Sequence, residues 1–217
     1  MWSLNHMLFL FLKMQFFKGL FKKKIPSSDM KKYLIVGLGN IGLEYEESRH
    51  NIGFQILDHI AEKNKAIWET KKLASLSIIK KKGKKFIFIK PTTFMNRSGK
   101  ALRYWALQEK VNIENILIVT DDLHLPFGTL RLKGKGSPAG HNGLKDIESE
   151  LNTPNYARLR FGIGQEKKPF DQVKFVLDNW NTNEKKHIKE RIELCNEIII
   201  TFVLEGLNST MNRFNGK

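Results

Sequence analysis

YLIVGLGNIGLEYEESRHNIGFQILDHI, residues 33–60, is the stretch that decides the fold class of this chain. Its first four residues form a short apolar run with β-branched side chains, which predicts a buried strand that ends at Gly37. Isoleucine then recurs at every fourth position, and this spacing predicts an amphipathic helix over residues 51–63. A polar loop that ends in His50 joins the strand to the helix. A strand followed by a helix is the repeating unit of an α/β protein.

The same alternation continues along the rest of the chain. Strands are predicted at residues 73–79, 86–89, 116–119 and 159–163, and helices at residues 98–108, 142–151 and 184–205. The first two of these strands are joined by a lysine-rich segment with a glycine, which is typical of a hairpin turn. We find no internal repeat and no linker, so residues 30–217 are expected to form one α/β domain. Its sheet should be twisted, mixed but mostly parallel, and flanked by helices.

The composition restricts the kinds of partner and compartment. The chain has 217 residues and a formal net charge of +15, which favours a polyanionic partner such as nucleic acid. Drift of the composition toward lysine explains the charge equally well when no other evidence is considered. The single cysteine, Cys195, excludes a disulfide framework and a cysteine-rich zinc site. A reducing, cytoplasmic location is therefore expected.

Residues 1–29 are treated apart from the fold. They hold five lysines, and their longest apolar run, residues 7–12, is too short to span a bilayer. An interfacial anchor with a basic face is one alternative. Because Met30 directly precedes the first predicted strand, the preferred interpretation is a basic extension that is either a disordered tail or a start-site artefact. No membrane association is expected.

The loop at residues 37–42 matches the pattern Gly-x-Gly-x-x-Gly, which raises the alternative of a nicotinamide-dependent oxidoreductase. In such enzymes the loop opens directly into a helix whose N-terminus holds the pyrophosphate. Here a polar stretch follows instead, and Asp58, at about the right distance for the ribose, falls inside a helical pattern. The dinucleotide interpretation is therefore disfavoured.

Several polar side chains follow predicted strands, where ligands gather in open α/β sheets. His50 can accept a proton near neutral pH, and Asp121, at a strand end, could orient its ring. Asn40 and Asn96 can donate hydrogen bonds to a carbonyl group or to a developing oxyanion. A single histidine is more often structural, but polar residues on several loops of one sheet edge favour a site. Since no nucleophile motif is present, the pattern favours a hydrolase that activates water.

A set of segments resembles the bacterial-type peptidyl-tRNA hydrolases over residues 30 to about 213. These segments are VGLGN at 36–40, Tyr45, RHNIGF at 49–54, PTTFMN at 91–96, SGK at 98–100, DDL at 121–123, LP at 125–126, GHNGLK at 140–145 and RLRFGIG at 158–164. No single segment is specific for this family, but the order and spacing of all the segments together are specific for it. The resemblance implies cleavage of peptidyl-tRNA into free peptide and tRNA, in translation and ribosome rescue.

The resemblance also implies roles for individual residues. His50 would be the general base that activates water, Asp121 would orient its ring, and Asn40 would position the water or the ester carbonyl. Five residues would bind the substrate: Tyr45, Asn51, Met95 through its backbone N–H, Asn96 and Asn142.

Further implications concern the tRNA and the edge of the cleft. Lys133 and Arg160 would bind the tRNA 5′-phosphate, and the loose segment at residues 165–180 would form a mobile lid. No cofactor and no metal ion are expected, in part because His141 and His124 do not obviously complete a ligand set with His50 and Asp121. The enzyme is expected to be a monomer whose partner is peptidyl-tRNA. A non-catalytic RNA-binding module remains the other alternative, since the basic charge alone would suit it.

Overall fold

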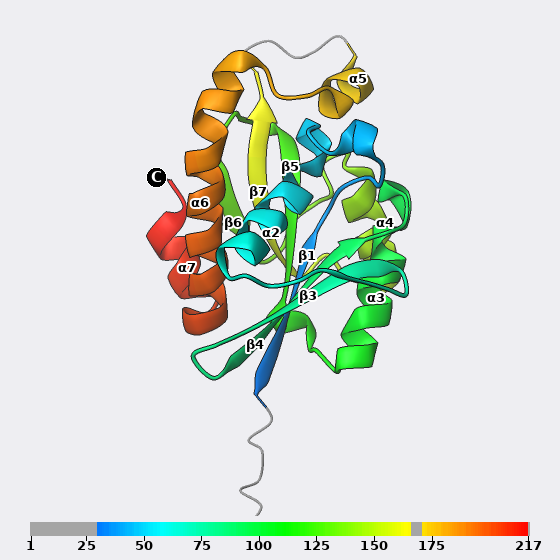
Figure 1. Cartoon of the computed structure of the whole chain (residues 1–217), viewed down its shortest axis with the longest axis vertical. Helices are drawn as coiled ribbons and strands as arrows, with labels where there is room; N and C mark the ends of the chain where they lie inside the picture. Colours follow the sequence, from blue (N-terminus) through cyan, green and yellow to red (C-terminus); the bar gives the residue numbers. More distant parts are fainter. Residues whose placement is uncertain (1–29, 166–170, 217) are drawn as a thin grey trace, which may run out of the picture. The chain divides into compact units, whose positions relative to one another are not determined.

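The computed structural model of the chain describes residues 30–165 and 171–216 (Figure 1). The predicted N-terminal extension, residues 1–29, lies outside them. The described residues form one seven-stranded mixed sheet with the strand order β2-β3-β4-β1-β5-β7-β6. The strands are β1 (Lys31–Gly37), β2 (Glu69–Lys71), β3 (Ala74–Lys81), β4 (Lys84–Pro91), β5 (Ile116–Pro126), β6 (Leu130–Lys133) and β7 (Ala157–Gly164).

The centre of the sheet is parallel and its two edges are antiparallel. Strand β1 pairs in parallel with β4 and β5, and β5 pairs in parallel with β7. The hairpin predicted at the lysine-rich segment is confirmed, because β3 and β4 pair antiparallel, as do β6 and β7. Strands buried on both faces are apolar throughout rather than alternating, which explains the continuous apolar run in β1.

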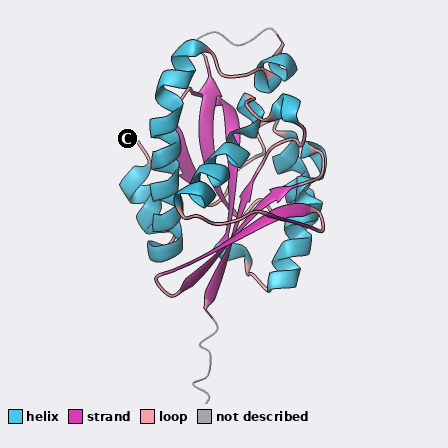
Figure 2. Cartoon of the chain, viewed as in Figure 1, coloured by secondary structure: helices cyan, strands magenta, loops and turns pink. Residues whose placement is uncertain are grey.

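Helices cover both faces of the sheet (Figures 1 and 2). Helices α2 (Ile52–Lys63), α6 (Thr182–Glu205) and α7 (Leu207–Phe214) pack on one face. Helices α3 (Ser98–Glu109) and α4 (Asn142–Leu151) pack on the other. The remaining helical elements are α5 (Gln172–Leu177) and the single turns η1 (Leu43–Tyr45), η2 (Arg49–Asn51), η3 (Met95–Arg97) and η4 (Ile113–Asn115). The expected single α/β domain with a mixed sheet is confirmed.

Strand β5 is longer than the sequence predicted. The strand was predicted over residues 116–119 with Asp121 at its end, but Asp121 and Asp122 lie within it and pair in register with Phe161 and Gly162 of β7. The absence of a side chain at Gly162 permits this pairing, because a Cβ atom there would lie 2.1 Å from the carbonyl oxygen of Pro126. Polar residues can thus extend a strand when the neighbouring strand supplies partners.

The segment predicted as loose between residues 165 and 180 is partly ordered as a helix. Helix α5 begins after Asp171, whose side chain accepts a hydrogen bond of 2.9 Å from the backbone N–H of Lys174. An N-cap of this kind satisfies one of the N–H groups that a helix start leaves unpaired. Residues 166–170 of the predicted lid lie outside the described residues.

The glycines of the 37–42 loop have a packing explanation. A Cβ atom on Gly37 would lie 2.4 Å from the carbonyl oxygen of Gly53, so β1 and α2 approach each other closely only because both positions are glycine. The helix begins at Ile52, well after Gly42, and the intervening residues form two single turns. The loop therefore does not lead directly into a helix, as it does in a dinucleotide-binding motif.

Candidate active site

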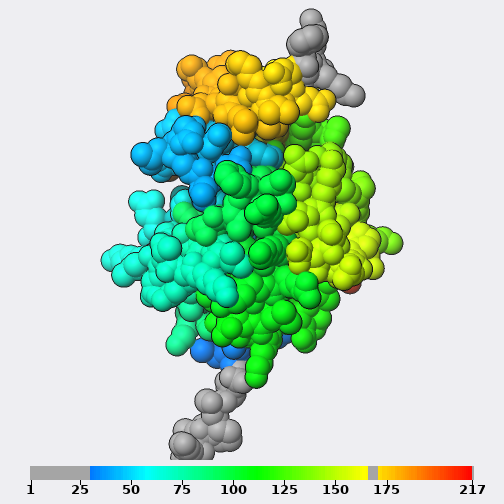
Figure 3. Space-filling model, turned by 90° about the vertical axis from the view of Figure 1, so that its right-hand side faces the viewer, coloured from blue at the N-terminus to red at the C-terminus, as the bar shows by residue number. Residues whose placement is uncertain are grey.

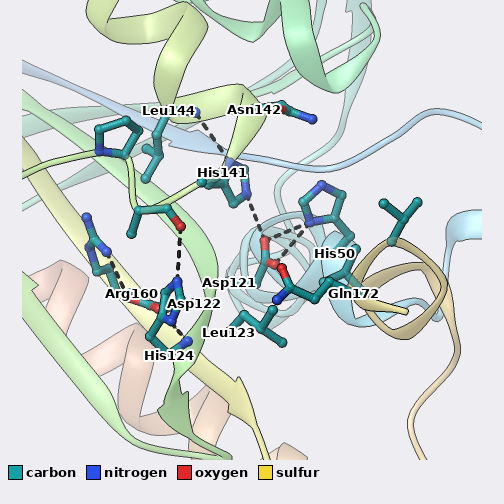
Figure 4. Close-up of a pocket in the computed structure, with 15 residues that line it drawn as sticks. His50, Asp121, Asp122, Leu123, His124, His141, Asn142, Leu144, Arg160 and Gln172 are labelled. Atoms are coloured by element: carbon teal, nitrogen blue, oxygen red, sulfur yellow. Dashed lines mark hydrogen bonds and ion pairs between the residues drawn. The ribbon is translucent and has the colours of Figure 1, made fainter. Parts of the chain in front are cut away.

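The candidate active site lies beyond the C-terminal end of β1, beside the middle of the adjacent parallel strand β5. The turn η2, which follows β1, carries His50, and β5 itself carries Asp121. His141, which directly precedes α4, reaches the same place from the other face of the sheet. Figure 4 shows both imidazole rings directed at the Asp121 carboxylate.

The ring of His50 is held by Asp121. Its Nδ1 atom lies 3.0 Å from each carboxylate oxygen. Since an ionised carboxylate can only accept, Nδ1 carries the hydrogen and Nε2 keeps its lone pair. The ring is mostly buried but lines a cavity, so a base is available at the edge of that cavity.

The pKa values of the two groups move in opposite directions. Burial by itself lowers the pKa of His50, but the negative charge of Asp121 and its hydrogen bond outweigh burial and raise that pKa above 6.5. Burial raises the pKa of Asp121, whereas the two histidines and their hydrogen bonds lower it well below its usual range. Asp121 is therefore a carboxylate at neutral pH, and it stabilises the protonated form of His50.

His141 is a member of the site that sequence reasoning missed. Its Nδ1 atom accepts hydrogen bonds from the backbone N–H groups of Gly143 and Leu144, at 3.1 and 3.3 Å, so it caps the N-terminus of α4. Its Nε2 atom must then carry the hydrogen, and it lies 2.9 Å from Oδ1 of Asp121. The GHNG segment signalled a helix start, but nothing local pointed to Asp121.

His50, Asp121 and His141 also form a geometric set that could be considered for a metal ion. Their ligand atoms all lie within 4.8 Å of one another, contrary to the expectation that His141 completes no such set. A metal ligand must present a lone pair. Because Nδ1 of His141 accepts from two backbone N–H groups, its Nε2 is protonated and cannot ligate. The tautomer of His141 therefore favours a hydrogen-bonded network.

Asn40 is held from two sides. The side chain of Asn51 accepts from the backbone N–H of Asn40 at 2.8 Å and donates to its carbonyl oxygen at 2.9 Å. The Oδ1 atom of Asn40 accepts from the backbone N–H of Met95 at 3.3 Å. Asn51 and Met95, expected to contact substrate, thus contact Asn40 in this structure. The remaining free group of the Asn40 side chain is its Nδ2 donor.

The other residues expected to bind substrate have exposed or partly exposed side chains. Asn96 and Asn142 are exposed, and Tyr45 is partly exposed. Within the described residues none of these three side chains forms a hydrogen bond, so their polar groups are available to a ligand. Asn142 lines the cavity beside His50, whose volume is about 160 Å³. Asn96 and Tyr45 do not line that cavity.

The two residues expected to bind phosphate differ in their surroundings. Lys133 is exposed and makes no ion pair within the part of the chain that the structure describes. Arg160 is buried; its guanidinium donates to Oδ2 of Asp122 at 2.8 Å and to the carbonyl oxygen of Ser137 at 2.6 Å. Lys133 pairs in register with Arg158, and residues two apart share a face of a strand, so Lys133 and Arg160 lie on the same face of the sheet.

Comparison with known proteins agrees with this geometry. A family model described as "Peptidyl-tRNA hydrolase" matches residues 34–217. A peptidyl-tRNA hydrolase of Bacteroides fragilis is 53% identical over 186 residues, which cover 86% of this chain and 100% of that protein. The corresponding protein of Cytophaga hutchinsonii is 47% identical over 86% of this chain and 99% of its own length.

A solved structure of a peptidyl-tRNA hydrolase also matches this chain. The crystal structure of peptidyl-tRNA hydrolase from Acinetobacter baumannii matches with a TM-score of 0.78 and 32% identity, over 86% of this chain and 96% of that chain. Neither the oxidoreductase nor the non-catalytic alternative is supported by these matches. None of the described helices has both the length and the apolar character needed to cross a membrane.

Proposed function

This chain belongs to the peptidyl-tRNA hydrolase family, and on that premise we propose that His50 is the general base of its reaction. The reaction is hydrolysis of the ester that joins a peptide to the 3′ ribose of tRNA, which releases free peptide and tRNA. The contact between Asp121 and Nδ1 of His50, at 3.0 Å, is the observation that carries this proposal. It leaves Nε2 of His50 as a lone-pair acceptor at the edge of a cavity.

The proposed chemical steps begin with water. Nε2 of His50 takes a proton from a water molecule while the water oxygen attacks the ester carbonyl carbon. The tetrahedral intermediate then collapses, the bond to the ribose oxygen breaks, and the imidazolium returns the proton to that oxygen. Asp121 stabilises the imidazolium in the meantime, which supports its assignment as the orienting residue. General-base assistance of this kind contributes about 10²–10⁴-fold.

Asn40 is proposed to stabilise the negative charge on the carbonyl oxygen. The Met95 N–H donates to Oδ1 of Asn40, which leaves Nδ2 as the group free to donate to an oxyanion. Asn51 supports this role indirectly, because it holds the backbone of Asn40 by two hydrogen bonds. In this proposal Asn51 and Met95 act through Asn40.

Exposed groups near the site are proposed to bind the rest of the substrate. Asn96, Asn142 and Tyr45 would contact the peptide. Lys133 would contact the tRNA phosphate directly as an exposed cation, and Arg160 would add positive charge nearby while it remains paired with Asp122. We propose that the enzyme is a monomer with one catalytic domain, residues 30–217, and that it acts in the cytoplasm.

The decisive experiment is hydrolysis of an N-blocked aminoacyl-tRNA by the wild type and by His50→Ala, both in the presence of a chelator. The wild type should release the blocked amino acid, and the variant should lose turnover by at least about 100-fold while it keeps its fold and its affinity for tRNA. Near-normal turnover by His50→Ala would contradict the base assignment. Loss of wild-type activity in chelator would show that a metal ion takes part.

A further inference from the structure

Arg49, the residue before the proposed base, is a buried cation that the mechanism above does not use. Only 4% of its surface is exposed, and it sits in the short turn η2. Its guanidinium forms a two-point ion pair with Glu184 near the start of α6, through Nε–Oε1 at 3.2 Å and Nη2–Oε2 at 2.8 Å. Burying such a pair is favourable only when the remaining donors are also satisfied. The pair with Glu184 uses Nε and Nη2, so the stability of the buried guanidinium depends on a partner for its third nitrogen, Nη1.

That third donor, Nη1, is directed at helix α5. It donates to the carbonyl oxygens of Phe175 and Asp178, at 3.2 and 3.1 Å. The backbone N–H of Arg49 donates to the same Asp178 carbonyl at 3.1 Å. The guanidinium carbon also lies 4.4 Å from the centre of the Phe175 ring. The last carbonyl groups of a helix lack partners within the helix, so Arg49 acts as the C-terminal cap of α5.

Helix α5 itself contributes few buried side chains. It has six residues, and Phe175 is the only one of them that is buried. Isolated helices of this length are unstable in water, so its position depends on tertiary contacts. A second attachment lies just beyond it, where the Trp180 indole N–H donates to the side chain of Gln55 at 3.0 Å. In Figure 3 the gold segment that contains α5 lies against the blue segment that contains η1 and η2.

The same helix lines the cavity of the active site. Gln172, Val173 and Val176 of α5 face that cavity together with His50 and Asp121 (Figure 4). The backbone of η2 is therefore bound on one side to the helix that covers the site, and it presents the proposed base on the other. A shift of α5 would pull directly on the residue next to His50.

We propose that Arg49 is a positioning residue: it couples the packing of α5 against the turn η2 to the position of the His50 ring beside Asp121. The inference rests on the proposed role of His50 as the base. When Nη1 donates to the carbonyl groups of Phe175 and Asp178, the turn η2 is fixed and the His50 ring is within hydrogen-bond distance of Asp121. When α5 lifts away, η2 loses this support and the base loses its alignment. The guanidinium suits this task because its planar fork binds the carboxylate and the carbonyls at once, which a lysine cannot do.

The test compares five variants with the wild type in single-turnover hydrolysis at saturating enzyme, a measurement that separates chemistry from binding. Arg49→Lys keeps the charge but loses the fork. Arg49→Met with Glu184→Gln removes the pair without leaving a buried unpaired charge, and the glutamine can still accept from the Asn181 N–H at the start of α6, so the variant protects against simple failure to fold. Lys174→Ala is the matched control, because it removes an exposed ion pair with Asp178 in the same segment and leaves the Arg49 contacts intact.

The single-turnover rate should fall by about 10- to 100-fold in Arg49→Lys and in the double variant. Hydrogen exchange of the amides in residues 172–178 should become faster in both. Lys174→Ala should match the wild type in rate. Ile198→Ala, a buried change in α6 away from η2, should lower the melting temperature without slowing the chemical step.

Full single-turnover rates in the Arg49 variants, with α5 exchange increased, would overturn the coupling. So would a loss of rate in Ile198→Ala equal to that of Arg49→Lys at the same loss of stability. His50→Ala is measured alongside: if it retains activity, the base assignment fails, whereas active Arg49 variants beside an inactive His50→Ala refute only the role of Arg49.

Discussion

The Nε2 atom of His141 lies 2.9 Å from Oδ1 of Asp121, so the carboxylate oxygen that contacts the His50 ring also contacts a second imidazole. The other ring nitrogen of His141, Nδ1, caps α4, so the Nε2–H group is the donor to Asp121. Helix α4 and the proposed base are linked through one carboxylate.

His141 has two functions, to cap α4 and to donate a hydrogen bond to Asp121, and two substitutions can distinguish them. His141→Asn should keep the cap on α4, because asparagine is among the best N-cap residues, but it loses the donor to Asp121. We expect stability close to that of the wild type and kcat lower by about tenfold, the worth of one hydrogen bond to a charged group. His141→Ala should in addition lose about 1 kcal/mol of stability. Urea denaturation and steady-state kinetics measure the two effects, and equal kcat in His141→Asn and wild type would contradict the prediction.

The pH dependence of kcat/KM should report the pKa of His50. The active form is the neutral ring, so the rate should rise with pH and reach half its plateau above pH 6.5, since Asp121 raises that pKa. In Asp121→Asn the attraction is lost while burial still lowers the pKa, so the midpoint should move to lower pH. The plateau should fall by at least about 100-fold because the imidazolium is no longer stabilised. A midpoint that does not move would show that Asp121 does not control the ionisation of His50.

Asn51 should affect catalysis through Asn40. Asn51→Asp keeps the acceptor for the Asn40 N–H at 2.8 Å but places a negative oxygen against the Asn40 carbonyl. The resulting displacement of Asn40 should lower kcat by about tenfold or more with little change in KM. If Asn51 instead contacts the substrate, KM should rise by the larger factor, so the division between kcat and KM decides between the two roles.

Lys133 should contribute to tRNA binding but not to the chemical step. Lys133→Ala removes one exposed cation, so the slope of log affinity against log salt should fall by about one unit. The plateau kcat should not change. Lys31→Ala is the control, because Lys31 is also exposed but lies at the start of β1, at the opposite end of that strand from the active site. Identical salt slopes for Lys133→Ala and wild type would remove Lys133 from the proposed interface.

Gly53→Ala should destabilise the whole domain. A Cβ atom at residue 53 would lie 2.5 Å from backbone atoms of Leu38 and Val119, which cannot move without separating α2 from the sheet. We expect a loss of about 3 kcal/mol or more in urea denaturation, or failure to fold. Gly83→Asn is the control: Gly83 has open space around it and a positive φ that asparagine tolerates, so only a small loss is expected.

Much of the fold could be predicted because its signals are local. The helix predicted over residues 142–151 coincides with α4, and the one predicted over 98–108 ends one residue before α3 does. Apolar spacing and helix-start residues lie within a few positions of one another, so the sequence alone carries them. The same holds for His50, Asp121 and Asn40, whose types and places after predicted strands indicated a hydrolytic site.

The contacts that organise the site could not be predicted in this way. Asp121 meets His50 across 71 positions of sequence and His141 across 20, and Arg49 meets Glu184 across 135. Each meeting depends on the strand order that sets β1 beside β5 and on the close approach of α2 to the sheet. By itself the sequence determined which elements form and which residues carry reactive groups. Only the tertiary structure decided which groups touch, because strand order and register are set by packing over the whole domain and not by any local pattern.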